Sequence, residues 1–452
     1  MADVPSIASP QRPTSERDDA LAVLRRLREA GHVAYFAGGC VRDQLLGLEP
    51  KDWDVATDAP PDRVRQLFSN TQAVGAAFGV ILVRHRKSMV EVEVATFRTD
   101  LEYKDGRRPE GVRFTTAEED AKRRDFTING LFQDPIEDRI IDYVGGQEDL
   151  KNSVLRAIGE PDRRFEEDHL RLLRAIRFAA RFELDIESRT ADAIRAHAPQ
   201  LKRISPERIA DELRRTLTLP VQGADWAWHA LLEEFPGLSD VIFRFLGSVP
   251  PGQSHHLEVR VFKGFSPDEP WPFSLALAAV TLDWAILVSP KTDLAALLDR
   301  PSVQRMVRAM RQSLRISNEE ADEMSGSLEG AGMLLREPSP GVVLLKRFLA
   351  RPTARLSRLL LNALTCHVGQ RVGELSARLD ELSKTQFAPA PLVTGDDLTA
   401  AGLKPGPVFK RVLDQVYNAQ LEDRVTSKED AMGLAMTLAR EGSGTPGPTD
   451  RR

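Results

Sequence analysis

Strand-type patterns are confined to one part of this 452-residue chain. Short runs rich in β-branched and aromatic residues, such as VAYFA and VEVEVATF, occur before residue 140, and almost none follow Gly159. Beyond that point apolar residues recur at helical spacing, as in SPERIADELRRTLT and ADWAWHALLEEF. The sequence therefore predicts a mixed α/β domain built around one sheet, followed by a long all-helical remainder.

Composition and helix ends divide the chain further. The predicted segments are a disordered N-terminal tail (1–17), an α/β head (18–150), a helical neck (151–215), a helical body (216–390), a helical tail (391–440) and a disordered C-terminus (441–452). A chain of this length is too long for one ordinary core, so several domains are expected.

Bulk composition excludes several classes of protein. Cys40 and Cys366 are the only cysteines, which rules out a disulfide framework and a cysteine zinc site. No run reaches the roughly 18 apolar residues of a membrane helix, and the first ten residues do not form a secretory signal. We therefore expect a cytoplasmic protein that does not bind a membrane. The net charge of -5 leaves nucleic-acid binding open, because a basic groove can lie within an acidic chain.

An aspartate pair lies in the stretch AGGCVRDQLLGLEPKDWDVAT, residues 37–57. Asp52 and Asp54 fall two apart in a predicted strand, so both carboxylates point to one face and Trp53 to the other. Such a pair can hold divalent metal ions, and Mg²⁺ fits because it takes hard oxygen ligands that it shares with substrate phosphates. A solvated polar strand edge is the alternative interpretation.

A glycine turn precedes this pair. Gly38 and Gly39 follow the strand VAYFA and open the short helix CVRDQLL, so backbone N–H groups there can face an anion. Arg42 lies one turn into that helix and can add positive charge against a triphosphate. Joined to the aspartate pair, the turn predicts a nucleotide-phosphate site beside a metal site, whereas alone it predicts only a tight connection.

A third carboxylate is offered by VEVEVATF. Glu91 and Glu93 share one face of this predicted strand, and the valines occupy the other. From alternation alone, Glu93 is either a further metal-site acid or an exposed glutamate on a half-buried strand.

Six stretches occur together in a fixed order: GGCVRD, DWD, EVATFR, DGRRP, RRDFTING and EEDHLRLLRAIRFAARF. With them, the chain resembles the class II tRNA nucleotidyltransferase and bacterial poly(A) polymerase family, within the polymerase-beta-like nucleotidyltransferases. The resemblance covers residues 33–182, and RISPERIADEL extends it to about residue 215. It implies an α/β nucleotidyltransferase head followed by an all-helical neck, body and tail.

The resemblance implies roles for individual residues. Asp52 and Asp54 would be the metal ligands and Glu93 the third catalytic acid. Arg124, Asp125 and Asn129 of RRDFTING would meet the incoming nucleotide, with Asp125 and Asn129 near the ribose.

EEDHLRLLRAI would read the nucleobase, through Asp168 and Arg171 on one face of a predicted helix. Arg174 and Arg177 would continue a basic, nucleotide-binding stripe on that helix. A carboxylate acceptor and a forked donor can match the edges of cytosine and adenine, so no nucleic-acid template would be required. An ordinary ion pair between residues three apart is the alternative.

The polar segment FRTDLEYKDGRRPEGVRF, residues 97–114, resembles the family's flexible loop. That loop is implicated in the switch from adding C to adding A, and its presence argues against an enzyme restricted to adding CC.

The C-terminal half resembles the family less closely. Residues 392–431 resemble a tail element that contacts the tRNA body, and Lys404, Lys410 and Arg411 are candidate RNA-phosphate contacts there. In SLALAAVTLDWA, Leu282 stands where a phosphohydrolase-type relative has a histidine. We therefore expect the body to keep a degenerate phosphohydrolase-like scaffold without that activity, although Asp283 is retained and His255 and His256 lie upstream.

Together these features predict a magnesium-dependent, template-independent enzyme that adds CCA to the 3′ end of tRNA from CTP and ATP. Three alternatives remain: an enzyme that adds only the final A, a poly(A) polymerase, and a catalytically silent RNA-binding protein. The poly(A) alternative is disfavoured because Ala76 and Ala77 stand where we associate a basic pair with poly(A) enzymes.

Overall fold

The structure is a computed structural model that describes residues 16–75, 79–84, 90–101, 111–250, 261–266, 270–365, 369, 371–404 and 406–443. Two compact units divide the chain, the first formed by Met1–Leu219 and Trp226–Ile242, the second by Pro220–Asp225 and Phe243–Arg452. The predicted head and neck therefore lie in one unit, and nearly all of the predicted body and tail in the other.

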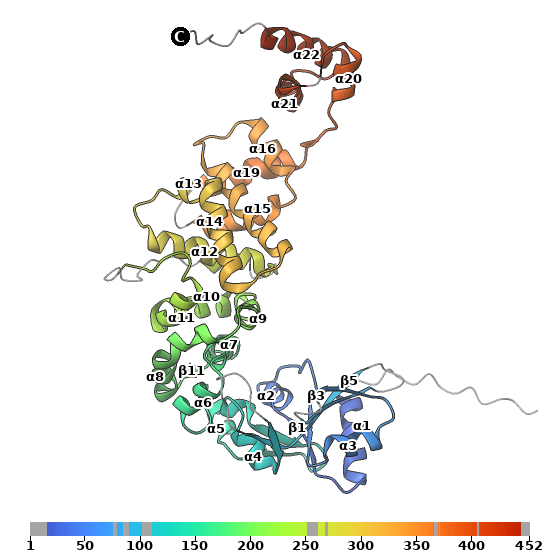
Figure 1. The fold of residues 1–452 in the computed structure, drawn as a ribbon, viewed down its shortest axis with the longest axis vertical. Coiled ribbons are helices and arrows are strands. Elements are labelled where there is room, and N and C mark those ends of the chain that lie inside the picture. Colours follow the sequence, from blue (N-terminus) through green and yellow to red (C-terminus); the bar gives the residue numbers. More distant parts are fainter. Residues whose placement is uncertain are drawn as a thin grey trace, which may run out of the picture. The chain divides into compact units, whose positions relative to one another are not determined.

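A seven-stranded mixed sheet is the centre of the first unit (Figure 1). Its strands lie in the order β3 (Thr71–Gly75), β4 (Val80–Arg84), β5 (Glu91–Thr96), β2 (Val55–Thr57), β1 (Ala34–Ala37), β8 (Leu131–Asp134) and β9 (Arg139–Asp142). Only β2 and β5 are parallel neighbours. The predicted sheet of the head is confirmed.

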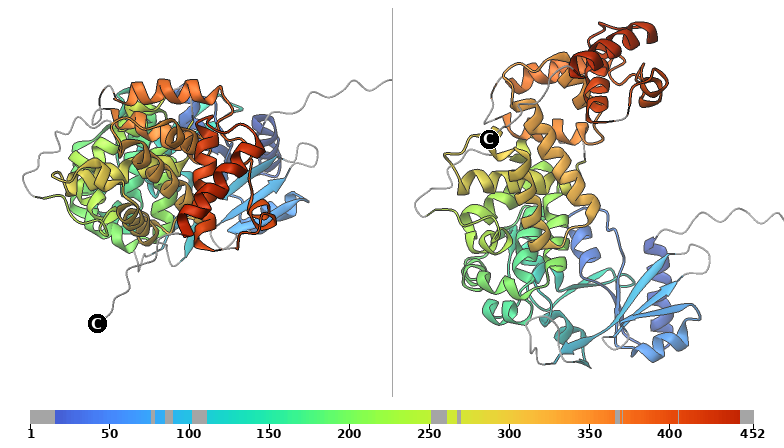
Figure 2. Two further views of the ribbon diagram at one scale, coloured as in Figure 1. Left: turned by 90° about the horizontal axis from the view of Figure 1, so that it is seen from above. Right: turned by 45° about the horizontal axis from the view of Figure 1, so that its top comes forward.

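Helices α1 (Glu16–Glu29) and α3 (Pro61–Leu67) cover one face of this sheet (Figures 1 and 2). The apolar stripe of α1, which includes Leu24 and Leu27, is fully buried there. Gly31, with φ 88°, ends this helix in the left-handed conformation that glycine tolerates. The other face packs in part on Ala117 and Ala121, through Ala37, Ala56 and Phe132.

Two predicted elements differ from the structure. The strand expected over residues 52–57 is only Val55–Thr57, so both aspartates lie in an extended segment just before β2. The helix expected over residues 166–182 is broken into α6 (Pro161–Glu167) and α7 (Arg171–Phe182). Asp168 between them is extended, with φ -148° and ψ 104°. Hence Asp168 and Arg171 do not share a helical face, which corrects that prediction.

The rest of the first unit consists of short elements around this framework. They include α2 (Gly39–Leu45), β6 (Arg98–Asp100), β7 (Val112–Phe114), α4 (Ala117–Lys122), α5 (Gly146–Lys151), β10 (Val154–Leu155), β11 (Asp185–Ile186), α8 (Ser188–His197), α9 (Pro206–Leu217), α10 (Val221–His229), which straddles the unit boundary, and α11 (Pro236–Ile242). Helices α7 and α9 pack on each other and carry several of the predicted neck residues.

The described residues of the second unit form helices joined by loops, with no strand among them. Its helices are α12 (Phe273–Val288), α13 (Leu294–Leu297), α14 (Arg300–Leu314), α15 (Asn318–Leu335), α16 (Val342–Leu349), α17 (Ala354–Ala363), α19 (Arg371–Ser383), α20 (Gly395–Ala400), α21 (Pro407–Leu421) and α22 (Lys428–Ser443). In the ranges that the structure describes, no helix has the length and apolar character needed to span a membrane.

Helix α12 carries SLALAAVTLDWA, the segment in which Leu282 stands where a phosphohydrolase-type relative has a histidine. Leu282 and Asp283 are both buried in it, with 0% and 2% of their surface exposed. His255 and His256 lie outside the described residues. At the position of the relatives' histidine, this chain therefore has an apolar side chain that lies in the core of the second unit.

Helices α16 and α21 are joined by two basic side chains. The buried Lys346 Nζ donates to the carbonyl oxygen of Leu421 at 2.6 Å, at the last residue of α21. Its neighbour Arg347 donates to Asn418 Oδ1 at 2.9 Å. A cation at the C-terminal end of a helix is favourable because the free carbonyls there carry partial negative charge.

Candidate active site

One cavity of about 520 Å³ in the first unit gathers most of the predicted site residues. The predicted residues that line it are Gly38, Gly39, Arg42, Asp54, Glu93, Arg124, Asp125, Asn129, Asp168, Arg171 and Arg174. They come from positions far apart in the sequence, and the fold brings the glycine turn, the acidic strands and the start of α7 to one place.

The acidic side chains lie on the sheet face opposite α1 and α3. Strands β2 and β5 pair in parallel register with Val55 opposite Val94, which sets Asp54 and Glu93 on the same side. Trp53 points the other way and packs on Phe36, with ring centroids 4.9 Å apart. The alternation predicted around the aspartate pair therefore holds, although the strand itself begins one residue later than Asp54.

Negative charge is clustered where Asp54 and Glu93 line the cavity. Burial, followed by the charge of Glu93, raises the pKa of Asp54 to about 7. Burial and the charge of Asp52 also raise the pKa of Glu93. Asp52 is exposed and does not line the cavity, yet its charge influences both acids. A bound cation would relieve this repulsion.

The acids fit a divalent cation that is shared with a substrate. Among the described residues, no three carboxylate, histidine or cysteine side chains converge on one point. Hard carboxylate oxygens with open positions suit Mg²⁺, which is usually held by one or two carboxylates plus phosphate oxygens. Asp54, Glu93 and the adjacent Asp52 are therefore the residues that would hold it.

The glycine turn is shaped around Arg124. Gly38 has φ 69° and ψ -116°, a conformation open mainly to glycine, and its N–H donates to the carbonyl oxygen of Leu131 at 2.9 Å. This N–H is thus unavailable to an anion, which corrects the expectation for Gly38. Arg124 lies against Gly38 and donates to the carbonyl oxygen of Asn129 at 3.1 Å. The turn therefore gives room to a guanidinium at the cavity wall.

We expect Gly38→Ala to damage the site and Gly39→Ala to be tolerated. A Cβ on Gly38 would lie 2.6 Å from Arg124 Nη1, and the backbone conformation would itself cost about 1–3 kcal/mol. A Cβ on Gly39 would lie 3.7 Å from its nearest neighbour, an ordinary contact.

Urea unfolding and nucleotide binding of the two variants, measured side by side, test this prediction. Equal stability and equal nucleotide affinity for both variants would show that the turn has no such constraint.

A buried network joins the glycine helix to the neck. Arg42 bonds to Asp43 Oδ1 and Asn129 Oδ1, and Asn129 Nδ2 donates to Asp125 Oδ1 at 3.0 Å. Arg174 from α7 closes the chain with two bonds to Asp125 Oδ2 at 2.8 and 2.6 Å. These residues hold one another in place at the back of the cavity.

Asp125 is more constrained than the sequence suggests. Its carboxylate accepts from the Phe126 N–H at 2.9 Å, from Asn129 and twice from Arg174, which fills its acceptor positions. Although burial opposes it, the Arg174 guanidinium and the Asn129 bond hold the pKa of Asp125 well below its usual range. Contact with a ribose hydroxyl would need one of these donors to be displaced.

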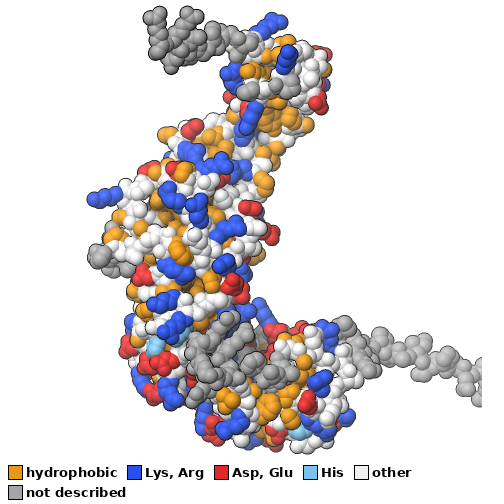
Figure 3. All heavy atoms as spheres, in the orientation of Figure 1, with side chains coloured by type: hydrophobic (Ala, Val, Ile, Leu, Met, Phe, Trp, Pro, Cys, Tyr) orange, Lys and Arg blue, Asp and Glu red, His pale blue; other side chains and the backbone are white. Residues whose placement is uncertain are grey.

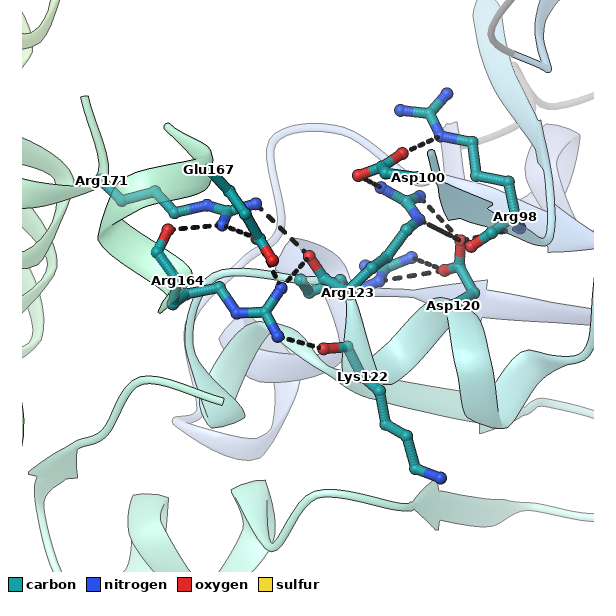
Figure 4. Close-up of polar contacts among 9 residues, drawn as sticks. Arg98, Asp100, Asp120, Lys122, Arg123, Arg164, Glu167 and Arg171 are labelled. Carbon is teal, nitrogen blue, oxygen red and sulfur yellow. Dashed lines mark hydrogen bonds and ion pairs between the residues drawn. The ribbon is translucent and has the colours of Figure 1, made fainter. Parts of the chain in front are cut away.

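The two residues expected to read the base are each anchored separately. Asp168 accepts from the Leu170 N–H at 3.0 Å and from Arg208 of α9 at 2.7 Å. Arg171 is bonded to Glu167 and donates to the carbonyl oxygen of Arg164 at 2.8 Å (Figure 4). Both still line the cavity, so their side chains present a fixed acceptor and a fixed donor there.

Besides Asp52, four predicted residues lie outside the cavity lining. Arg177 is buried and pairs with Glu212 at 2.6 Å, so the nucleotide-binding role expected for it is not supported by its position. Lys404, Lys410 and Arg411 belong to the second unit. They are exposed, and they form no ion pair with any residue that the structure describes.

Sequence reasoning missed several residues that line the cavity. Arg98, Arg123 and Arg208 add positive charge, and Phe178 adds an aromatic face. Arg123 is oriented by Asp120, at 2.7 Å, and by Asp100 (Figure 4). The RRD motif pointed to Arg123, but only tertiary structure shows that Arg208 reaches the site. Ala76, Ala77 and most of the predicted loop (102–110) lie outside the described residues.

Comparison with known families agrees with this geometry. Residues 34–156 match the family described as the poly A polymerase head domain. This part of the chain is similar to poly A polymerase head domains. Residues 183–239 match a second family, described as the probable RNA and SrmB-binding site of polymerase A. The first match contains the sheet, the acids and the glycine turn, and the second contains α8 and α9.

Individual relatives are similar over the same region. A CCA-adding enzyme of Streptococcus pyogenes serotype M2 (strain MGAS10270) is 45% identical over 207 residues, which is 46% of this chain and 51% of that protein. A CCA-adding enzyme of Geobacillus thermodenitrificans (strain NG80-2) is 46% identical over 202 residues, 44% of this chain and 49% of that protein. The chain thus matches about half the length of these curated relatives.

Solved structures extend the similarity in fold beyond the head. The Bacillus stearothermophilus CCA-adding enzyme in complex with CTP matches with a TM-score of 0.67 at 27% identity, over 96% of this chain and 100% of that one. The Thermotoga maritima CCA-adding enzyme complexed with tRNA matches with a TM-score of 0.61, over 94% of this chain and 96% of that one. At 18% identity, the second match shows a common fold alone.

Proposed function

We propose that this chain is a template-independent RNA nucleotidyltransferase that adds C and A, from CTP and ATP, to the 3′ end of tRNA in the order CCA. One observation carries the proposal: the acids Asp54 and Glu93, the glycine turn and the neck pair Asp168 and Arg171 line one cavity. The 45% identity to a CCA-adding enzyme over this region supports the choice of reaction. A cytoplasmic location is part of the same proposal, because tRNA is used there.

The reaction joins the RNA to the α-phosphate of the nucleotide. The terminal 3′-hydroxyl oxygen attacks that phosphorus, the bond to the β-phosphate oxygen breaks, and pyrophosphate leaves as the hydroxyl proton is lost. Mg²⁺ held by Asp52, Asp54 and Glu93 would supply charge neutralisation for both oxygens. Arg42, Arg124 and Arg98 place guanidinium groups around the cavity, where they favour a triphosphate.

Base choice would rest on protein side chains. Asp168 offers an acceptor and Arg171 a forked donor, the combination that suits the edges of cytosine and adenine. Arg208 and Glu167 hold these two groups in fixed orientations before a nucleotide enters. Pre-organisation of this kind lowers the entropy lost on binding.

Extension of three purified tRNAs tests the proposal against its alternatives. The tRNAs lack CCA, end in C, or end in CC, and each is incubated with CTP or ATP separately. We expect CTP to extend the first two and ATP to extend only the third.

Addition of A to the third substrate, with no C added to the first two, would identify an enzyme that adds only the final A. Long adenylate tails on unrelated RNA would identify a poly(A) polymerase, and no incorporation at all a silent RNA-binding protein. A chelator control reports whether the activity needs a divalent metal.

A further inference from the structure

Helix α14 in the second unit carries a row of arginines and no acidic residue. Residues 300–315 read RPSVQRMVRAMRQSLR and contain five arginines but no aspartate or glutamate. These arginines, Arg300, Arg305, Arg308, Arg311 and Arg315, are all exposed and are called the α14 arginine row below. The opposite face of the helix, including Met306 and Met310, is buried against the body.

The row lies on one side of the helix. At 100° per residue, the four arginines within α14 fall in an arc of about 140°, and the helix is about 22 Å long. Arg315 follows directly at the C-cap, with φ 53°. In Figure 3, Lys and Arg side chains are visible at several points over the region where Figure 1 labels α13, α14 and α15. The helix thus presents a linear positive surface.

None of the five forms an ion pair with any residue that the structure describes. Arg305 donates only to Ser302 Oγ, at 2.8 Å, and Arg311 only to Asn318 Oδ1. Hydrogen bonds from the backbone and side chain of Ser302, and then the charges of Arg305 and Arg336, lower the pKa of Asp299, which caps the helix.

Three other arginines of this unit form ion pairs. Arg347 meets Asp414, Arg351 meets Glu329, and Arg358 meets Asp380. Like charges three or four residues apart destabilise a helix by about 0.2–0.5 kcal/mol per pair. The row therefore carries like-charge repulsion along the helix, which a ligand of opposite charge would offset.

We propose that the α14 arginine row binds the phosphodiester backbone of RNA. The inference rests on the proposed function, in that the RNA is the body of the tRNA substrate. Guanidinium groups bind phosphate oxygens through paired hydrogen bonds, and a row along a helix suits an extended polyanion. The exposed positions between the arginines are Pro301, Gln304 and Gln312, and no large apolar side chain of this helix is exposed. A protein interface would be expected to include such an apolar anchor.

The test is binding of a fluorescent tRNA lacking CCA, without nucleotide, between 50 and 200 mM salt. The variant is Arg305→Ala/Arg308→Ala/Arg315→Ala. We expect weaker binding and a log Kd against log salt slope that is lower by about 2–3, because each lost phosphate contact contributes about 0.7–0.9. Lysine at the same three positions should keep most of the slope, since the charge remains.

A matched control removes three ion-paired cations from the same unit. Arg358, Lys384 and Arg424 pair with Asp380, Glu381 and Glu422, so their replacement by Ala should leave the salt slope near wild type. Thermal unfolding of both triple variants checks that each of them folds.

An unchanged affinity and slope in the α14 variant would overturn the inference. The inference would also be overturned if the α14 variant lost binding to polyglutamate but still bound RNA, because the row would then be a protein-docking surface. The proposed function is tested separately. It is wrong if the wild-type chain incorporates no nucleotide, and in that case the binding assay still reports on the row.

Discussion

Asp54→Ala is expected to lower nucleotide incorporation by on the order of 10²–10³-fold or more, because it removes charge stabilisation at the reacting phosphate. Asp54 lines the cavity on the same sheet face as Glu93, where burial and the neighbouring acids raise its pKa to about 7. Asp54→Asn keeps the shape and should be nearly as inactive, since an amide is a poor ligand for a divalent cation. Binding of tRNA should be almost unchanged, because the lost group faces the nucleotide.

Glu91→Ala is the matched control for these variants. Glu91 lies two residues before Glu93 on β5, points to the same side, and is paired with Arg84 outside the cavity lining. Its loss should leave incorporation near wild type. Substantial activity in both Asp54 variants would mean that the acidic face does not hold the catalytic metal.

The second large effect is expected for Asp125→Ala. This change removes the closer of the two carboxylate partners of Arg174, leaving the 3.7 Å ion pair with Glu212, and breaks the network that runs to Asn129 and Arg42. Breaking a buried ion pair costs about 3–5 kcal/mol, and we expect the lower end because 31% of the Arg174 side chain is exposed. Chemical unfolding measures this loss, and nucleotide affinity should fall with it because the cavity wall loosens.

The pH dependence of stability provides the check. The pKa of Asp125 is lower in the folded than in the unfolded state, so its stabilising contribution is present above the unfolded carboxyl pKa of about 3.9 and is lost as pH falls. The difference in unfolding free energy between wild type and Asp125→Ala should therefore shrink between pH 6 and pH 3. A difference that stays constant over that range would assign the loss to packing.

Much of the head could be predicted from local signals. Alternation in VEVEVATF and the apolar run VAYFA set the two strands, and glycines at 31, 38 and 47 marked the turns, each with positive φ in the structure. The position of the acids followed from the two-residue repeat of a strand. These features depend on neighbouring residues, which a sequence displays directly.

The neck could not be predicted in the same way. Residues 166–182 carry an uninterrupted helical pattern with no glycine or proline, yet the chain is extended at Asp168. Asp168 is held there by Arg208, which is 40 residues further along, and by the N–H of Leu170. A tertiary contact outweighs helix propensity at this point. For the same reason Arg177, which shares the spacing of Arg171 and Arg174, pairs with Glu212 instead of lining the cavity.

The most direct measurement of the central claim is the sequence of the RNA ends that the purified chain makes. A tRNA lacking CCA is incubated with CTP, ATP and Mg²⁺, and its 3′ ends are sequenced. We predict that CCA is added and that synthesis then stops. Ends that remain unextended, or that carry only adenylates, would contradict the account.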